Sequence, residues 1–549
     1  MVNLQRAIES SPPIKDANVQ FKRLLETLAR SSAHAVTTLG RGQKEQDELK
    51  DYLYVETAIE KDFRKMLESS PAGDTVVFLC GSSGDGKSEI LRRYYESYSE
   101  RFRFHLDATH AFKPDQNAID ALDQLFDEHG ASSKPLVVGI NVGMLFNFAS
   151  QGHPRHERIR NAIESYLQSG DEISPSYKFL NFEKYPKFSI EDGKTGSSFI
   201  SELISRAVAS TESNPLHRAY LEAVQTNPST LTLNYELLQH EQVRERVVHL
   251  LLSARLKFDQ FLSARALLDF VYHLISGPGL LFNNLFVAGH NDLSDVISHF
   301  DPCTIRSRSI DQFLIQHPLG IRDADFDEFH KSVLESLGII SIDSAGWLRF
   351  FYLFKNVDIG NNFHQRFQED FEQPLYDRYI EVWRLHKNYD GTVEQRQKLR
   401  TFYKDELVSA LVRFGNRLDP SLTARQHLFL CSRNGVFVSA VADIKPDLKR
   451  IESENMANIH EFPVCLKVGD EPLQTFNVSL SFLELVSKIN DGYRPNKHDK
   501  NTIVILEEIV DDVIKVIIRS NKLMFSNGSE HVFLTNEIED NEIVVGGVE

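Results

Sequence analysis

The first third of the chain alternates between short apolar segments and longer amphipathic ones. Residues 75–80, 102–106 and 136–141 are short, contain β-branched or aromatic side chains, and are typical of strands. Between these segments, apolar side chains recur at helical spacing, at Ile90, Leu91, Tyr94 and Tyr98 and again at Ile119, Leu122, Leu125 and Phe126. Strands that alternate with helices predict an α/β fold in which a parallel sheet is covered on both faces.

The rest of the chain is predicted to be mostly helical until a mixed region near its end. Residues 14–67 carry two amphipathic stripes, and the polar segment between them, 38–50, is interpreted as a loop. Residues 177–182 are aromatic-rich and predict a further short strand. Hairpins are predicted at 464–478 and around Asn527-Gly528, because turn residues there separate apolar runs.

These patterns divide the chain into five predicted parts. They are an N-terminal helical region at 1–70, an α/β core at 71–200, a helical region at 201–290, a helical domain at 291–424, and a C-terminal α+β domain at 425–549.

The most informative motif follows the first predicted strand of the core. Its residues are Gly81, Ser82, Ser83, Gly84, Asp85, Gly86, Lys87 and Ser88, a complete Walker A loop of the form G-x-x-x-x-G-K-[ST]. Glycines let the backbone N–H groups turn inward toward phosphate oxygens. Lys87 is expected to contact the β- and γ-phosphates of ATP, and the Ser88 hydroxyl is expected to ligate Mg²⁺.

The predicted elements on either side of this motif favour a phosphate site over a fortuitous glycine turn. The strand at 75–80 precedes the loop, and the helix that begins near Lys87 follows it. This order aims the N-terminus of a helix at the bound phosphates. The sequence therefore predicts a P-loop NTPase core that binds a nucleoside triphosphate.

An acidic metal ligand is expected at the end of a neighbouring strand. Asp107, which ends the segment 102–106, is the candidate for the Mg²⁺ site. The alternative is that Asp107 caps a helix or is a surface carboxylate. The sequence contains no apolar strand that ends in the usual pair of acidic residues, so hydrolysis is predicted to be slow or dependent on a partner.

Two further polar residues are candidates for catalysis. Asn141 ends the strand at 136–140, where a polar amide resembles the sensor-1 residue of AAA+ ATPases; the alternative is an Asn that bonds to its own turn. Arg265, in a helix-favouring segment, resembles the sensor-2 arginine of an AAA+ lid; the alternative is an exposed helix arginine. The region 201–290 is therefore interpreted as lid-like, and the core as AAA+-like.

Charge and cysteine content restrict the remaining classes. The net charge of −17 means that the whole surface cannot bind DNA, although local basic patches or a basic partner remain open. The four cysteines are far apart, which argues against a zinc site or a disulfide framework and fits a reducing compartment. The N-terminus resembles no secretory signal, and no apolar run is long enough to span a bilayer, so we expect a cytoplasmic protein with no membrane partner.

Three segments together resemble one known family. They are residues 80–88, residues 106–110 (Leu-Asp-Ala-Thr-His) and residues 139–148 (Gly-Ile-Asn-Val-Gly-Met-Leu-Phe-Asn-Phe). The chain is similar here to the DptF family of bacterial DNA phosphorothioation-dependent restriction proteins. The resemblance implies an ATP-binding subunit that acts with DptG and DptH on DNA lacking backbone sulfur, contacting the DNA directly or through these partners.

Other functions are kept as alternatives to this resemblance. One is a signalling or scaffolding P-loop NTPase that never contacts DNA, and another is a kinase for a small molecule or nucleoside. ATP turnover that is stimulated by DNA would favour the restriction subunit over both alternatives.

Overall fold

The computed structural model describes most of the chain, in two compact units. The described residues are 17–29, 44–69, 71–108, 116–169, 174–185, 189–191, 194–258, 262–289, 292–337, 342–372, 374–453, 460–519, 522–527, 530–537 and 542–546. Unit 1 comprises residues 1–255 and 260–372, and unit 2 comprises residues 256–259 and 373–549. The boundary between the units therefore lies near residue 373, whereas the sequence pattern placed the start of the last domain at 425.

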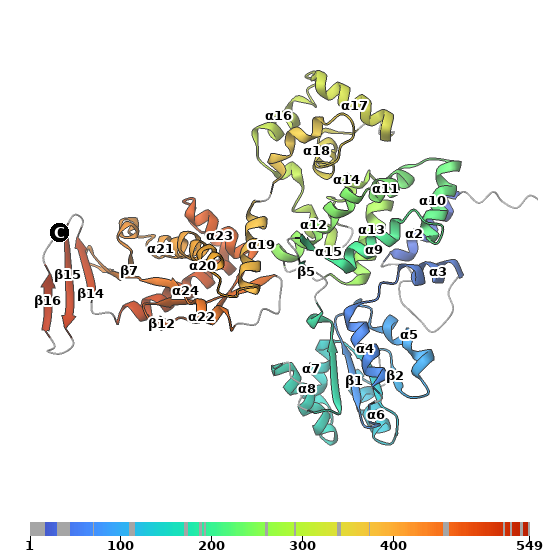
Figure 1. The fold of residues 1–549 in the computed structure, drawn as a ribbon, viewed down its shortest axis with the longest axis horizontal. Helices are drawn as coiled ribbons and strands as arrows, with labels where there is room; N and C mark the ends of the chain where they lie inside the picture. The colour runs from blue at the N-terminus through green and yellow to red at the C-terminus, as the bar shows by residue number, and fades with distance from the viewer. Residues whose placement is uncertain are drawn as a thin grey trace, which may run out of the picture. The chain divides into compact units, whose positions relative to one another are not determined.

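Unit 1 contains the α/β core and most of the helices (Figure 1). Its strands are β1 (Val76–Cys80), β2 (Arg103–His105), β3 (Leu136–Ile140), β4 (Tyr177–Asn181), β5 (Ser189–Glu191) and β6 (Lys194–Gly196). Its first helices are α2 (Ala17–Leu25), α3 (Lys44–Leu53), α4 (Ala58–Glu68), α5 (Lys87–Tyr98), α6 (Ala118–Gly130), α7 (Val142–Gln151) and α8 (Glu157–Ser169). Those that follow are α9 (Ser198–Val208), α10 (Pro215–Thr226), α11 (Thr230–Gln239), α12 (Glu241–Phe258), α13 (Ala264–Ser276), α14 (Leu281–Asn284), α15 (Asp292–Ser298), α16 (Arg308–Gln316), α17 (Ala324–Leu337) and α18 (Ser344–Leu353).

The predicted parallel sheet is present, with strand order β2-β3-β1-β4. The strand β1 pairs in parallel with β3, from Val76 opposite Leu136 to Cys80 opposite Ile140, and with β4 on its other side. All five residues of β1 are buried, as are all five of β3, so both strands are covered on both faces. The segments at 75–80, 102–106, 136–141 and 177–182 were thus predicted correctly as strands.

Alternate residues of β1 face two separate cores. Val76, Phe78 and Cys80 pack with side chains of α6, α7 and α8 on one face of the sheet. Val77 and Leu79 pack with side chains of α4 and α5 on the other face. The core is therefore a three-layer arrangement in which the loop after β1 emerges between two helical layers.

One local prediction was wrong. The segment 38–50 was interpreted as a loop, but residues 44–50 belong to α3, and residues 38–43 lie outside the described residues. Leu49 and Leu53 lie one turn apart on this helix and are 0% and 5% exposed, respectively. Their burial against the rest of unit 1 stabilises a helix whose own sequence is strongly polar.

Unit 2 combines helices with short antiparallel sheets. Its helices are α19 (Pro374–Lys387), α20 (Val393–Thr401), the π-helix η7 (Phe402–Val408), α21 (Ser409–Gly415), α22 (Leu448–Ile451), α23 (Leu480–Asn490) and α24 (Lys500–Ile517). Its strands are β7 (His427–Arg433), β8 (Val436–Val441), β9 (Ile444–Pro446), β10 (Glu461–Val464), β11 (Leu466–Val468), β12 (Glu471–Pro472), β13 (Phe476–Ser479), β14 (Lys522–Asn527), β15 (Glu530–Glu537) and β16 (Glu542–Gly546).

Both predicted hairpins occur in unit 2. The segment 464–478 forms two nested antiparallel pairs, β11 with β12 and β10 with β13, which belong to different sheets. The strands β14 and β15 are paired from Lys522 opposite Thr535 to Asn527 opposite Glu530, and Gly528 of the predicted turn lies outside the described residues. Within the described ranges, no helix has the length and apolar character that a bilayer crossing requires.

The packing of β1 yields a prediction about stability. Phe78 is 0% exposed, stacks on Phe179 with a centroid distance of 5.0 Å and contacts Phe126 edge-on at 6.2 Å. We expect Phe78→Ala to destabilise the sheet by about 3–5 kcal/mol, because it removes buried aromatic contacts and leaves a cavity. Hydrogen–deuterium exchange of the peptides covering β1 and β3 measures this loss. The control Phe146→Ala removes a ring that is 63% exposed, and equal acceleration in both variants would contradict the assigned core.

Candidate nucleotide-binding site

The glycine-rich loop connects the end of β1 to the start of α5. Gly84 has a φ of +84° and Gly86 a φ of +102°, in the left-handed region that favours glycine. Gly86 directly precedes α5, so these dihedrals set the direction in which the helix leaves the loop. The loop is also tied to the sheet, because Gly81 N donates to Ile140 O of β3 at 3.3 Å. The strand, loop and helix predicted around this motif are therefore all present.

Two side chains of the loop are held by the loop itself. The ammonium of Lys87 donates to Gly81 O at 2.9 Å and to Ser82 O at 2.7 Å. The buried carboxylate of Asp85 accepts from Ser82 N at 2.7 Å. Lys87 is thus positioned over the loop backbone, where its charge is available to an anion that enters the loop.

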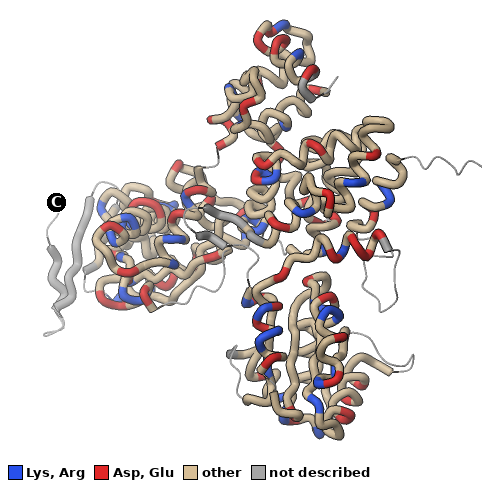
Figure 2. The backbone as a smooth tube through the Cα atoms, turned by 45° about the vertical axis from the view of Figure 1, so that its right-hand side comes forward, with Lys and Arg blue, Asp and Glu red and all other residues tan. Residues whose placement is uncertain are grey.

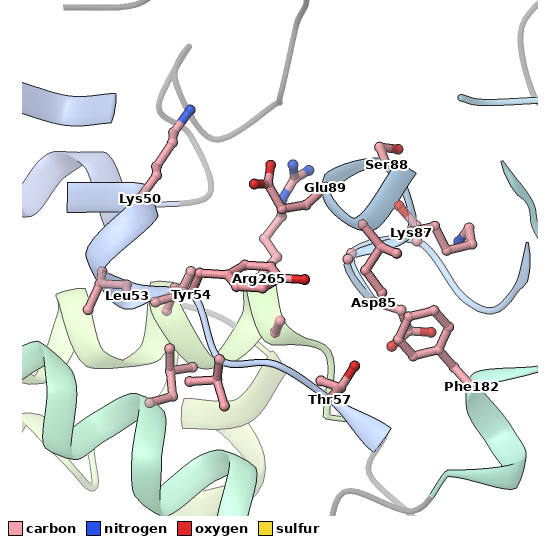
Figure 3. A pocket seen from close by; sticks show the side chains of 18 of the residues that line it. Lys50, Leu53, Tyr54, Thr57, Asp85, Lys87, Ser88, Glu89, Phe182 and Arg265 are labelled. Carbon is pink, nitrogen blue, oxygen red and sulfur yellow. The ribbon is translucent and has the colours of Figure 1, made fainter. Parts of the chain in front are cut away.

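A cavity of about 570 Å³ adjoins the loop (Figure 3). Residues 83–88 line one end of it, together with Asp107, Asn141 and Arg265. The other end is walled mainly by apolar side chains from four separate segments: Leu28, Leu49, Leu53, Val55, Phe199, Leu203 and Leu268. The cavity is therefore polar where the glycine loop lies and largely apolar beyond it.

The helix α13 closes the cavity by contacting the loop directly. Arg265 N donates to Gly84 O at 3.4 Å, and Ser263 caps the helix by accepting from Ala266 N at 3.1 Å. A Cβ at Gly84 would lie 3.1 Å from Ser263 Oγ and 3.2 Å from the Cβ of Arg265. The positive end of a helix and the Arg265 side chain therefore both lie at the end of the cavity where the glycine loop is.

Asp107 and Asn141 lie at the carboxyl ends of neighbouring strands. Asp107 follows β2 and is exposed, and the next residue fixes its backbone because Ala108 N donates to Gly139 O at 2.9 Å. Asn141 follows β3, the strand beside β1, and its side-chain oxygen accepts from Met144 N at 2.6 Å as the N-cap of α7. This bond matches the alternative given for Asn141, an Asn that bonds to its own turn, and it leaves the Nδ2 donor for a ligand.

Two arginines of the segment 152–160 are engaged within the α/β core. Arg155 makes a paired contact with Asp127, through Nε at 2.9 Å and Nη2 at 2.8 Å. Arg160 donates from Nε to Ala149 O at 2.9 Å. These bonds hold both side chains against α6 and α7 and give them a local structural role.

A cluster that no sequence motif indicates joins α3 to α5, the helix after the glycine loop. The Arg93 guanidinium lies 3.5 Å from the centroid of the Tyr54 ring and donates to Asp51 at 2.9 Å and to Glu89 at 3.0 Å. The Tyr54 hydroxyl donates to Glu60, and burial together with this carboxylate raises the pKa of Tyr54. No motif links these residues, because they approach one another only when α3 packs against α5.

The donor set suits a magnesium ion bound chiefly through phosphates. Within the described residues, no three His, Cys, Asp or Glu side chains gather as a metal-holding group. Ser88 and Asp107 both line the cavity and supply oxygen ligands. Mg²⁺ commonly keeps waters and takes only one or two protein oxygens beside substrate phosphates, which is what these two residues provide.

Comparison of the chain with protein-family models, with curated proteins and with solved structures finds no match.

The contact between the loop and α13 gives a prediction that needs no ligand. Gly84→Ala places a Cβ against Ser263 and Arg265 and forces a non-glycine residue to a φ of +84°, whereas Gly86→Ala at φ +102° meets no atom within 4 Å. Both changes cost about 1–2 kcal/mol of backbone strain. We expect only Gly84→Ala to speed hydrogen–deuterium exchange at the start of α13, and equal exchange in the two variants would refute the contact.

Proposed function

We propose that this protein binds ATP with Mg²⁺ in the cavity beside the glycine loop and hydrolyses it. One observation carries the proposal: the complete Walker A loop, with both central glycines left-handed, opens into a cavity that is polar at the loop and largely apolar beyond. A nucleotide has the same division between its phosphates and its base. The cavity volume of about 570 Å³ also lies within the usual range for ligand sites.

At the phosphate end, Lys87 and the loop backbone bind the anion. The ammonium of Lys87 exchanges its bonds to Gly81 O and Ser82 O for phosphate oxygens, which are stronger acceptors because they are charged. The hydroxyl of Ser88 and the carboxylate of Asp107 would hold Mg²⁺, which when bound neutralises charge on the phosphates. The N-termini of α5 and α13 add their positive ends to the same region.

At the other end, the apolar wall holds the base. Leu49 and Leu53 belong to α3, Leu203 belongs to α9, and Leu268 belongs to α13. Three helices therefore enclose this part of the cavity. Burial of the faces of a purine against such side chains removes apolar surface from water, which stabilises the bound nucleotide. Tyr54, held by Arg93 and Glu60, adds an aromatic ring to the same wall.

For hydrolysis, the strand order supports an AAA+-like assignment. Asn141 lies at the end of the strand beside β1, and Asp107 lies at the end of the next strand outward. We assign the Nδ2 group of Asn141 to orienting the attacking water and Arg265 to stabilising charge that develops on the phosphates. Glu89, the acidic residue next to Ser88, is bonded to Arg92 and Arg93, so it is poorly placed to act as a general base. Slow or partner-dependent turnover follows.

For the biological setting, we propose a subunit of a DNA phosphorothioation-dependent restriction system that acts with DptG and DptH on unmodified DNA. This proposal is supported only by the resemblance of residues 80–88, 106–110 and 139–148 to the DptF family. Thr109 and His110 of the second segment lie outside the described residues. The alternative is a signalling or scaffolding NTPase that uses the same nucleotide site without DNA.

The first test replaces the P-loop lysine. We expect Lys87→Ala to raise the Kd for a fluorescent ATP analogue by about 10- to 100-fold, because it removes a charged hydrogen bond worth about 1.5–3 kcal/mol. Lys65→Ala serves as the control, since Lys65 pairs with Asp62 on α4 and does not line the cavity. Equal affinity in wild type and Lys87→Ala would refute the proposed site.

The second test separates turnover from binding. Asp107→Asn is expected to lower Mg²⁺-dependent ATP turnover by about 10- to 100-fold while Mg²⁺-free nucleotide binding is kept. The control is Glu128→Gln, because Glu128 pairs with Arg103 at the opposite end of β2. Undiminished turnover in Asp107→Asn would remove this residue from the metal site. Each assay is run with and without duplex DNA and partner proteins, since DNA-independent turnover throughout favours the signalling alternative.

A further inference from the structure

A stripe of unpaired basic side chains runs along the helix formed by α20 and η7 in unit 2. Arg396, Arg400 and Lys404 are exposed and line one surface hollow of about 520 Å³. The hollow is completed by Val393, Gln397, Thr401 and Asp405. Arg396, Arg400 and Lys404 are here called the basic stripe.

The sequence around the basic stripe gives it no acidic partner one turn away. Arg396, Arg400 and Lys404 follow one another at intervals of four residues, so each has another cation as its neighbour. Like charges at this spacing destabilise a helix by about 0.2–0.5 kcal/mol per pair. Among the described residues, none of the three forms an ion pair with a carboxylate.

The other side of the same helix shows the usual arrangement. Lys398 pairs with Glu394 at 2.8 Å, and Arg378 of α19 pairs with Glu381 at 2.6 Å and also with Glu406 of η7. In Figure 2, basic and acidic positions are likewise interspersed along most of the chain. The basic stripe thus departs from local charge pairing within a chain whose net charge is −17.

Packing does not account for the basic stripe. The helix is anchored by Leu399, Phe402 and Tyr403, which are fully buried, while the side that carries the stripe faces solvent. The turn at 402–408 is a π-helix, a rare element that is frequent at functional sites. A repulsive set of side chains that contributes nothing to the core is best explained by a ligand of opposite charge.

We propose that the basic stripe binds the phosphate backbone of a nucleic acid. The helical rise places successive stripe residues about 6 Å apart, which gives a regular row of cations over about 12 Å. Gln397 lies between them and adds an amide donor, whereas the Thr401 hydroxyl donates to Gln397 O at 3.1 Å. Arginine, lysine and glutamine side chains are usual ligands of phosphate oxygens. A membrane surface fits less well, because Val393 is the sole apolar side chain lining the hollow in the described chain.

Two neighbouring acids limit how many phosphates the stripe neutralises. Asp405 lines the same hollow. Glu452 lies near Arg396, because Glu452 Oε1 and Arg396 Nη2 are each 3.2 Å from the position that a Cβ on Gly391 would occupy. We therefore expect about two to three phosphate contacts. Binding of this kind is independent of base sequence and weakens as salt concentration rises.

The test neutralises the stripe in the full-length protein. The variant Arg396→Gln, Arg400→Gln, Lys404→Gln is compared with a matched control, Lys398→Gln, Lys445→Gln, Lys515→Gln. The control removes three exposed lysines that are paired with Glu394, Asp443 and Asp512 and so changes the net charge equally. Affinity is measured by fluorescence anisotropy with labelled single-stranded and duplex DNA over a salt series, and thermal melting checks folding.

The stripe variant should bind DNA at least about tenfold more weakly than wild type at low salt. The slope of log K against log salt should be shallower by about two to three units, while the control stays close to wild type. The melting temperature of the stripe variant should not fall, because removing like charges relieves their repulsion. Undetectable DNA binding by wild type, or equal losses in the stripe variant and the control, would overturn the proposal. Binding of an anionic vesicle or acidic peptide, but of neither DNA, would also overturn it.

Discussion

The candidate site depends on the burial of β1 at the interior of a parallel sheet. Because β1 is covered on both faces and paired on both edges, its carboxyl end is fixed in position and direction. The glycine loop therefore begins at a fixed position. Its two left-handed glycines turn the chain so that the N-terminus of α5 points toward the cavity. Parallel pairing also brings the ends of β2 and β3 to the same edge, which is why Asp107 and Asn141 reach the same cavity.

The remainder of the cavity comes from segments outside the sheet. The α3 helix is attached to α5 by Arg93, which bridges Asp51 and Glu89 and lies over Tyr54. On the opposite side, α13 contacts the loop through Arg265 N and Gly84 O. A ligand in this cavity would therefore contact the sheet, α3 and α13 at once. A displacement of the loop would therefore change its contacts with both helices.

The two units differ in how their basic side chains are paired. In unit 1, the arginines near the core are used locally: Arg155 and Arg160 bind the sheet's covering helices, and Arg93 binds α3. In unit 2, the basic stripe is left without such partners. Because the net charge of the chain is −17, the positive potential of the basic stripe is a local exception to the charge of the whole chain.

The sequence by itself determined the parallel sheet, the glycine loop and several of the polar residues that line the cavity beside that loop. Strand and helix periods and the Walker A spacing are local signals, and they placed Lys87, Ser88, Asp107 and Asn141 at element ends that the fold confirms. The polar segment that became α3 was missed, because its helix is stabilised by burying Leu49 and Leu53 rather than by its own composition. The apolar wall and the Tyr54–Arg93 contact were decided only by tertiary structure. Both join residues that are far apart in the chain, so no local pattern indicates them.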